Sequence, residues 1–211
     1  PIPEEYGGKN GSNLEMAIIR EHFAAKGLGL HNDLQNEHSI VANNVGLLLM
    51  LAYGTEIQKE EWIPLLLAGK RGFAFGITEP DHGSDATHME TSAVRDGDHF
   101  IINGQKVWTS HANKCDWIFC LTRTSNEGVK QEGITFILFD MESEGVTVRQ
   151  IELISGASPF CEVFCDNVKA LASNVVGEVD DGWKVAKALL NYERSMIGEA
   201  IGGQMEGTEK K

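Results

Sequence analysis

The period of the hydrophobic residues changes twice along the chain, and this change constrains the fold more than any other feature. Residues 1–70 carry apolar side chains at the spacing of amphipathic helices, and residues 71–178 show the two-residue alternation of short strands. The helical spacing returns over residues 179–211. The sequence therefore predicts an α+β chain with a helical N-terminal domain, a β middle domain and a further helix.

Capping residues indicate where the helices begin. The segments Ser12–Glu15 and Thr55–Gln58 each have the capping-box pattern, in which a hydroxyl residue is followed three positions later by Glu or Gln. Glycines follow the helical stretches and are typical of their ends. The predicted helices cover residues 12–27, 33–53 and 55–69, and a fourth begins at Asp181.

Glycine turns divide the middle part into short strands. Asp96-Gly97 and Asn103-Gly104 are both flanked by alternating residues and predict tight hairpins. The even spacing of the strands favours an antiparallel barrel or sandwich. The predicted strands are 73–77, 90–95, 99–102, 105–109, 116–122, 134–139, 146–150 and 161–165.

Composition limits the classes of partner. The 211 residues include 31 acidic and 18 basic side chains, and the formal net charge of −13 argues against nucleic acid or an anionic membrane surface. No apolar run reaches the length of a membrane span, and no His, Asp or Glu set has the spacing of a metal site. The four cysteines lie in apolar, strand-like runs and predict buried free thiols: Cys115, Cys120, Cys161 and Cys165.

Two segments contain the residue types that hold a phosphate-bearing ring cofactor. The first is Phe75-Gly-Ile-Thr-Glu-Pro-Asp-His-Gly-Ser-Asp85, where the Gly83-Ser84 pair combines close backbone approach with a hydroxyl and amide groups for phosphate. The second is Asn103-Gly-Gln-Lys-Val-Trp-Thr-Ser110, where Trp108 can stack on a flat ring and Ser110 shares its side of a strand. Each segment alone is explained equally well as a surface turn or a hairpin with a core tryptophan.

Taken together, the segments resemble the acyl-CoA dehydrogenase family of flavoproteins. The resemblance runs nearly end to end and implies that family's fold: a helical domain, a β domain, and a C-terminal helical bundle of which this chain would contain the first helix. The matching residues are Pro3-Glu-Glu-Tyr-Gly-Gly8, Gly54-Thr-Glu-Ile-Gln-Lys59, Trp62, Ile77-Thr-Glu-Pro80, Gly83-Ser84-Asp85, Ile101-Ile-Asn-Gly-Gln-Lys106, Trp108, Gly177-Glu178, Gly182-Trp183 and Glu193-Arg194.

The resemblance implies FAD-dependent α,β-dehydrogenation of an acyl-CoA thioester. A carboxylate would remove the proton at Cα, and the hydride at Cβ would pass to flavin N5. Thr78 would face the polar edge of the flavin, Trp108 would cover one ring face, and Ser110 would lie near N5. By position, the cofactor-binding residues are Phe75 (often Tyr in relatives), Ile77, Thr78, Gly83, Ser84, Trp108, Thr109 and Ser110.

The base has two alternative positions in the family. Most members use a Glu from a later part of the C-terminal domain, whereas a minority use a Glu directly before an Arg, and Glu193 stands at that position. Asn191 and Arg194, three residues apart on the same helical face, match positions that contact the CoA side of the substrate, as Ser84 does in part.

The resemblance also implies partners and location. The substrate would be an acyl-CoA, the electron acceptor an electron-transfer flavoprotein or similar protein, and the assembly a homodimer or homotetramer in the cytoplasm, or in the mitochondrial matrix of a eukaryote. Three alternatives remain: an acyl-CoA oxidase, a non-catalytic scaffold that keeps the fold, and an all-β carbohydrate- or protein-binding domain with a helical cap.

Overall fold

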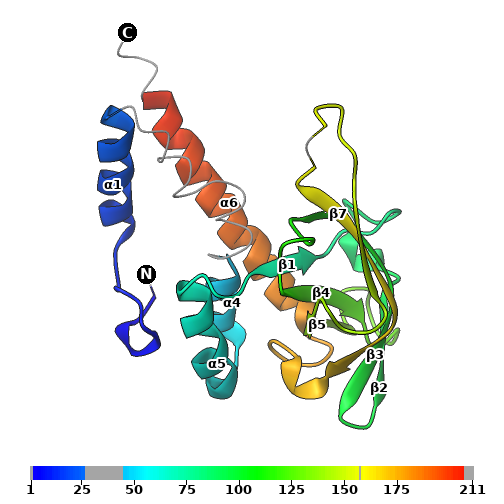
Figure 1. Ribbon diagram of the computed structural model, residues 1–211. Helices are drawn as coiled ribbons and strands as arrows, with labels where there is room; N and C mark the ends of the chain where they lie inside the picture. The colour runs from blue at the N-terminus through cyan, green and yellow to red at the C-terminus, as the bar shows by residue number, and fades with distance from the viewer. Residues whose placement is uncertain (1, 27–44, 157, 207–211) are drawn as a thin grey trace.

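A computed structural model describes residues 2–26, 45–156 and 158–206, with the backbone alone for residues 13, 20, 24 and 195–206. Helices and a curled sheet occupy different sides of the molecule, and α6 runs obliquely between them (Figure 1). The α+β organisation expected from the changing period is therefore confirmed. The helices are α1 (Asn13–Ala25), α4 (Val45–Tyr53), α5 (Glu56–Leu67) and α6 (Gly182–Glu206).

Both predicted capping boxes are present. In the first, the Ser12 amide donates to Glu15 Oε2 at 2.6 Å, and the Glu15 amide donates to Ser12 Oγ at 3.2 Å. In the second, Thr55 and Gln58 exchange the equivalent bonds at 3.0 and 3.2 Å. The helix expected at 33–53 lies partly outside the described residues, and its described portion is α4.

The strands form a single mixed sheet in the order β1-β4-β2-β3-β7-β6, and β5 pairs with β4. The expectation of a wholly antiparallel sheet is wrong, because β4 lies parallel to β1 and meets β2 in parallel at its end. The chain leaves β1, forms the β2–β3 hairpin and returns in the original direction. The strands are β1 (Phe73–Gly76), β2 (Ser92–Asp96), β3 (His99–Ser110), β4 (Trp117–Arg123), β5 (Ile134–Asp140), β6 (Val146–Gln150) and β7 (Phe160–Leu171).

The two glycine turns have different outcomes. The Asp96-Gly97 turn joins β2 to β3 as predicted, with Asp96 opposite His99 and Gly97 at φ 59°. The Asn103-Gly104 prediction is wrong, because β3 continues unbroken through it and shifts its register against β7 there. A Cβ on Gly104 would lie 2.6 Å from Cα of Thr91. Gly104 is therefore part of a β-bulge, where the absence of a side chain allows the backbone of Thr91 to approach closely, and it does not form a turn.

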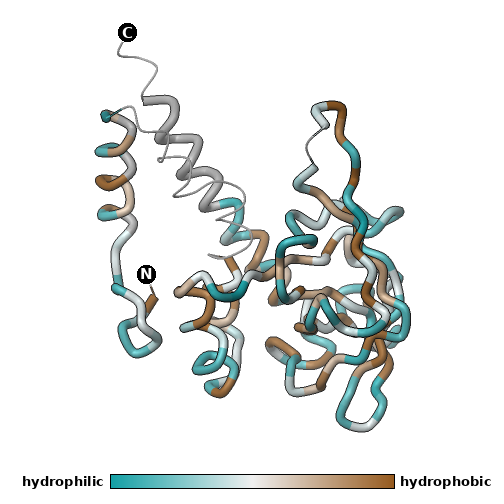
Figure 2. The backbone as a smooth tube through the Cα atoms, in the orientation of Figure 1, coloured by the Kyte–Doolittle hydropathy of each residue, from teal (hydrophilic) through white to brown (hydrophobic). Residues whose placement is uncertain are grey.

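Alternation along β1 and β4 separates two hydrophobic clusters. Phe73 and Phe119, with Trp62 of α5, belong to the cluster between the sheet and the helices. Ala74 and Ile118 point to the opposite face, into the curl of the sheet. Hydrophobic stretches on α4 and the central strands mark these clusters in the hydropathy-coloured tube (Figure 2).

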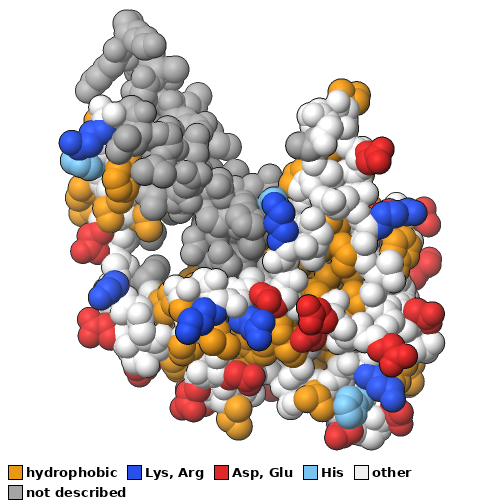
Figure 3. All heavy atoms as spheres, viewed as in Figure 1, with side chains coloured by type: hydrophobic (Ala, Val, Ile, Leu, Met, Phe, Trp, Pro, Cys, Tyr) orange, Lys and Arg blue, Asp and Glu red, His pale blue; other side chains and the backbone are white. Residues whose placement is uncertain are grey.

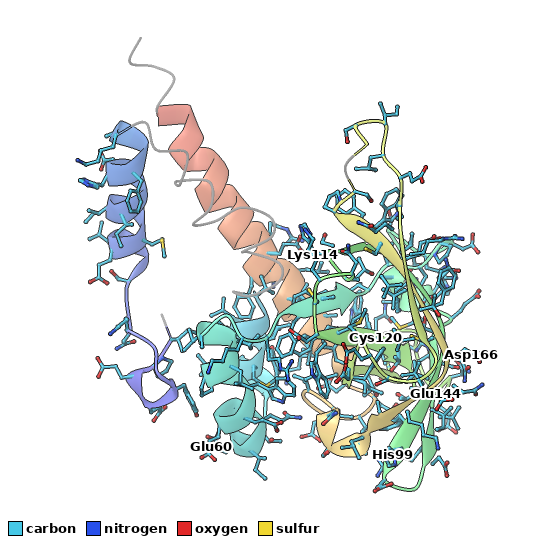
Figure 4. The ribbon with its side chains drawn as sticks, in the orientation of Figure 1. Glu60, His99, Lys114, Cys120, Glu144 and Asp166 are labelled. Atoms are coloured by element: carbon cyan, nitrogen blue, oxygen red, sulfur yellow. The ribbon has the colours of Figure 1, made fainter. Side chains whose placement is uncertain are left out.

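The cysteines confirm the expectation of free thiols. Cys120, Cys161 and Cys165 are buried in the cluster inside the curl, and Cys115 is half-buried. Cys120 lies within the sheet, whereas the exposed Glu144 and Asp166 lie toward its outer edge (Figure 4).

Helix α6 begins in direct contact with the sheet. A Cβ on Gly182 would lie 2.6 Å from the backbone nitrogen of Phe136 on β5. Val185, Ala186 and Leu189 then continue into the cluster shared with the other helices. The close start of α6 fixes the direction in which the rest of the helix leaves the sheet.

Candidate functional site

A hollow of about 170 Å³ lies where the end of β1, the end of β3 and α6 meet. It brings together six residues that the sequence singled out, although they come from three distant segments. That volume is below the 300–1,000 Å³ range typical of whole ligand pockets. The lining residues are Val45, Phe75, Ile77, Thr78, Val107, Trp108, Ser110, Leu189, Leu190 and Glu193.

Trp108 is the most exposed large aromatic at this hollow. Its side chain is 54% exposed, and it makes an edge-on ring contact with Phe160, at 5.9 Å between centroids. Its φ of 59° is unusual for a bulky residue. A second register shift of β3 against β7, between Lys106 and Thr109, accompanies this conformation. Backbone strain of this kind costs about 1–3 kcal/mol and is concentrated at functional sites.

The bulge decides which side chains of β3 face the hollow. Lys106 and Thr109 are turned inward, with 0% and 1% of their surfaces exposed, while Trp108 and Ser110 face the hollow. Thr109, which the resemblance assigned to the cofactor site, does not line this hollow, and its Oγ1 has no hydrogen-bond partner within the described ranges. Strand alternation placed Trp108 and Ser110 on one side, and both do line the hollow.

Polar groups on two sides could bind the edges of a ring. Thr78 and Ser110 supply hydroxyls, and the carbonyl of Thr78 accepts a hydrogen bond from the Val107 amide at 2.9 Å. Phe75 forms the apolar floor and stacks on Phe119, with centroids 5.2 Å apart and planes 8° from parallel. The combination suits a flat heteroaromatic ring with polar edges.

Other expected site residues lie outside the hollow. Gly83 and Ser84 are exposed in the loop that follows β1. Asn191 and Arg194 are exposed on α6, where Arg194 Nη1 donates to Asn191 Oδ1 at 3.2 Å. Glu193, between them, lines the hollow with Leu189 and Leu190. Of these three α6 residues, Glu193 lines the hollow, whereas Asn191 and Arg194 are exposed outside it.

The loop after β1 is anchored by a buried ion pair to which the sequence reasoning gave no role. Lys106 Nζ lies 2.8 Å from Glu79 Oε1, and the two side chains are 0% and 4% exposed. Glu79 also accepts the backbone amides of Glu90 at 2.6 Å and Thr91 at 3.0 Å. Burial alone would raise the pKa of Glu79, but the Lys106 charge and these hydrogen bonds lower it overall.

The outer end of the same loop is held by an exposed cluster. Asp85 accepts hydrogen bonds from Lys130 at 2.7 Å and Thr87 at 2.6 Å, and pairs with His88 at 2.7 Å. The bonds from Lys130 and Thr87 hold the pKa of the Asp85 carboxyl well below its usual range. The loop carrying Gly83 and Ser84 is thus fixed at both ends.

Several lining residues were missed by the sequence reasoning. Val107 belongs to β3, and Leu189 and Leu190 precede Glu193 by one helical turn. Helical spacing from Glu193 could have identified the two leucines. In the described part of the chain, no three His, Cys, Asp or Glu side chains are grouped to hold a metal ion. None of the described helices has both the length and the hydropathy needed to cross a membrane.

Comparison with known proteins gives matches over most of the chain. A model of the acyl-CoA dehydrogenase N-terminal domain matches residues 1–70, and a model of the middle domain of the same family matches residues 74–168. Among curated proteins, acyl-CoA dehydrogenase FadE29 of Mycobacterium tuberculosis is 35% identical over 198 residues, which are 94% of this chain and 49% of that protein.

Solved structures agree with these matches. Glutaryl-coenzyme A dehydrogenase, in its complex with glutaryl-CoA, has a TM-score of 0.80 and 31% identity over 96% of this chain and 51% of its own. The prolyl acyl carrier protein oxidase AnaB has a TM-score of 0.82 and 28% identity over 98% of this chain and 54% of its own. The chain spans about half the length of the relatives it matches.

Proposed function

Because the chain belongs to the acyl-CoA dehydrogenase family, we propose that its protein catalyses FAD-dependent α,β-dehydrogenation of an acyl-CoA thioester. The observation that carries this proposal is the hollow that Thr78, Trp108, Ser110 and Glu193 line together. An aromatic surface, polar ring-edge groups and a base are the protein groups that this reaction needs.

The residues of the hollow fit an isoalloxazine ring. Trp108 packs against one ring face, and Phe75 and Ile77 supply apolar surface. Thr78 would bind the polar edge, and Ser110 would donate a hydrogen bond where negative charge would develop on reduction. Gly83 and Ser84, which are exposed in the loop after β1, would bind the pyrophosphate. FAD supplies the acceptor for the hydride that leaves Cβ.

Glu193 is the base in this proposal. Glu193 lines the hollow together with Leu189 and Leu190. It removes the proton at Cα, while Asn191 and Arg194 contact the CoA side of the thioester together with Ser84. An electron-transfer flavoprotein or similar acceptor then reoxidises the enzyme, which we propose to be a homodimer or homotetramer of the cytoplasm or the mitochondrial matrix.

The visible absorption spectrum of the full-length gene product tests the cofactor assignment. We expect a bound flavin band that bleaches anaerobically when an acyl-CoA is added. Absence of bound flavin, even with excess FAD, would contradict the proposal and would favour a scaffold that keeps the fold without turnover.

An acyl-CoA oxidase is the second candidate, favoured by the similarity to an acyl carrier protein oxidase. Both candidates predict a flavin that substrate bleaches. They differ in the next step, because an oxidase is reoxidised by oxygen and a dehydrogenase needs a protein acceptor. Stopped-flow mixing of the reduced enzyme with air-saturated buffer decides between them, and we expect slow reoxidation.

Replacing the base tests its assignment. Glu193→Gln should slow flavin reduction by acyl-CoA about 10²- to 10⁴-fold, because the amide cannot accept the α-proton. The flavin spectrum of the variant before substrate should be unchanged. Glu61→Gln, an exposed substitution on α5, is the control and should reduce at the wild-type rate. Full activity of Glu193→Gln would mean that the base is another residue.

A further inference from the structure

The buried pair Lys106–Glu79 lies behind the hollow and lines no part of it. Fully buried charged side chains are rare, and a buried ion pair is weak evidence for added stability, because desolvation opposes the attraction of the charges. Among the described residues, Lys106 is the only ion-pair partner recorded for Glu79. Stability alone therefore does not explain why this pair is buried behind the hollow.

The contacts of the pair are concentrated on one short backbone segment. Lys106 Nζ contacts the carbonyl oxygen of Ile77 at 3.4 Å as well as Glu79 Oε1 at 2.8 Å. The neighbouring Val107 amide holds the carbonyl of Thr78 at 2.9 Å. Three consecutive residues, 77 to 79, are thus tied to two consecutive residues of β3.

The geometry of the peptide unit shows in which direction the backbone N–H of Thr78 points. The peptide unit between Ile77 and Thr78 is trans and planar, so its carbonyl and its N–H point to opposite sides. Because Lys106 is completely buried behind the loop and holds the Ile77 carbonyl, the Thr78 N–H is directed away from Lys106. Ile77 and Thr78 both line the hollow on that other side.

Glu79 holds the ammonium group of Lys106 in place. Its two carboxylate oxygens accept the amides of Glu90 and Thr91, which hold the carboxylate in one orientation. Lys106 is in turn held between Glu79 and the Ile77 carbonyl. The opposite charges of Lys106 and Glu79 largely cancel, so the pair produces little net electric field at the hollow. The pair therefore acts by orienting the peptide unit between Ile77 and Thr78.

We propose that Lys106 and Glu79 are positioning residues that present the backbone amide of Thr78 to the polar edge of the bound flavin. The proposal rests on the proposed function, because it takes the ring of FAD as the occupant of the hollow. A backbone donor fixed before binding loses no freedom when the ligand arrives, and such preorganisation strengthens binding.

A double variant separates positioning from stability. Glu79→Gln with Lys106→Met removes both charges together and so avoids an unpaired buried charge. The Gln amide nitrogen cannot accept one of the two backbone amides that Glu79 holds, so we expect a folded variant that is less stable by about 1–3 kcal/mol. The Ile77 carbonyl loses its donor, and the 77–78 peptide unit is no longer held. We expect FAD to bind roughly tenfold more weakly to the full-length variant, the equivalent of one hydrogen bond.

Spectra add a readout that stability alone does not change. The carbonyl stretching bands of isotope-labelled FAD should shift to higher frequency in the double variant, because a hydrogen bond to a flavin carbonyl is weakened. Lys59→Met is the matched control, since it breaks the Lys59–Glu56 pair on the surface of α5. It should leave both FAD affinity and the bands unchanged.

Hydrogen exchange in the wild-type protein tests the same point without a substitution. The Thr78 amide should exchange at least tenfold more slowly when FAD is bound. Wild-type affinity and spectra in a stably folded double variant, or unchanged exchange of Thr78 on FAD binding, would overturn the positioning role alone. A wild-type full-length protein that binds no FAD would instead overturn the proposed function.

Discussion

At the scale of single residues, the backbone conformation of Trp108 links local strain to the proposed cofactor. A φ of 59° places a bulky side chain in a region that favours glycine. More than half of the indole is exposed, so its contribution to folding is limited to its buried part and to the edge contact with Phe160. The strain is therefore better explained by binding than by stability.

Trp108→Gly should consequently separate folding from binding. Relief of strain, about 1–3 kcal/mol, opposes the lost packing, so we expect the free energy of unfolding to change by no more than about 1 kcal/mol. The affinity for FAD, measured by quenching of flavin fluorescence, should fall at least tenfold. Asn167→Gly, at φ 55° on β7, is the matched control and should leave FAD affinity unchanged. Strong unfolding of Trp108→Gly would show that the indole is a core residue.

The ionisation of Glu79 makes a second residue-scale prediction. Its folded pKa is lowered below the ordinary 4.5, so the ionised carboxylate contributes stability that is fully present above that pH. The contribution is lost as the pH falls through the lowered folded pKa. Below about pH 4.5, the free energy of unfolding of the wild type should therefore fall more steeply with decreasing pH than that of the double variant Glu79→Gln/Lys106→Met. Urea unfolding at a series of pH values measures this difference. Parallel pH profiles for the two proteins would contradict this account.

At the scale of elements, local signals were predictable and non-local ones were not. The capping boxes and the Asp96-Gly97 hairpin depend on residues within a few positions, and all three are present. Asn103-Gly104 carries an equally strong hairpin signal, but its conformation is decided by the approach of Thr91 and the pairing with β7. The parallel pairing of β1 with β4 and the burial of Lys106 likewise depend on distant segments.

The start of α6 gives a prediction about how elements fit together. Gly182→Ala should destabilise the protein by about 1–3 kcal/mol, because the new methyl group would meet the backbone of β5 at Phe136, which cannot move aside as a side chain can. Thermal or urea unfolding measures the loss. Gly72→Ala is the control, since its Cβ would lie 3.8 Å from the nearest atom, Cys115 Sγ, and should change stability by less than about 0.5 kcal/mol. Equal effects at both positions would contradict close contact at Gly182.

At the scale of the whole molecule, apolar surface is distributed unevenly. Hydrophobic side chains are visible along α1 in the space-filling view (Figure 3), and four of them are exposed: Leu14, Met16, Ile18 and Ile19. The sheet packs most of its apolar residues into two clusters, and Val94, Trp108 and Leu171 are its exposed exceptions. The described portion of the chain is therefore well packed around the sheet and much less so at α1.

Thiol labelling should report this difference between the packed sheet and its surroundings. Burial raises the pKa of Cys120 to about 11 and also raises that of Cys165, so both should react with iodoacetamide only after global unfolding. Cys115 is only half-buried, and burial raises its pKa to about 11, so it should react slowly in the folded state. Mass spectrometry of peptides labelled across a urea series measures each site. Labelling of Cys120 before the main transition would show that the sheet opens locally.

The parallel pairing of β1 with β4 also has a consequence during protein synthesis. Strand β1 emerges from the ribosome with Phe73 and Phe75 unpaired, and its neighbour β4 follows roughly forty residues later, which corresponds to about 2–8 seconds of translation. The β2–β3 hairpin closes within microseconds of being made, whereas the aromatic edge of β1 has to wait for a distant partner. The backbone edge of β1 therefore stays unpaired during this interval, and this is when a holding chaperone would act.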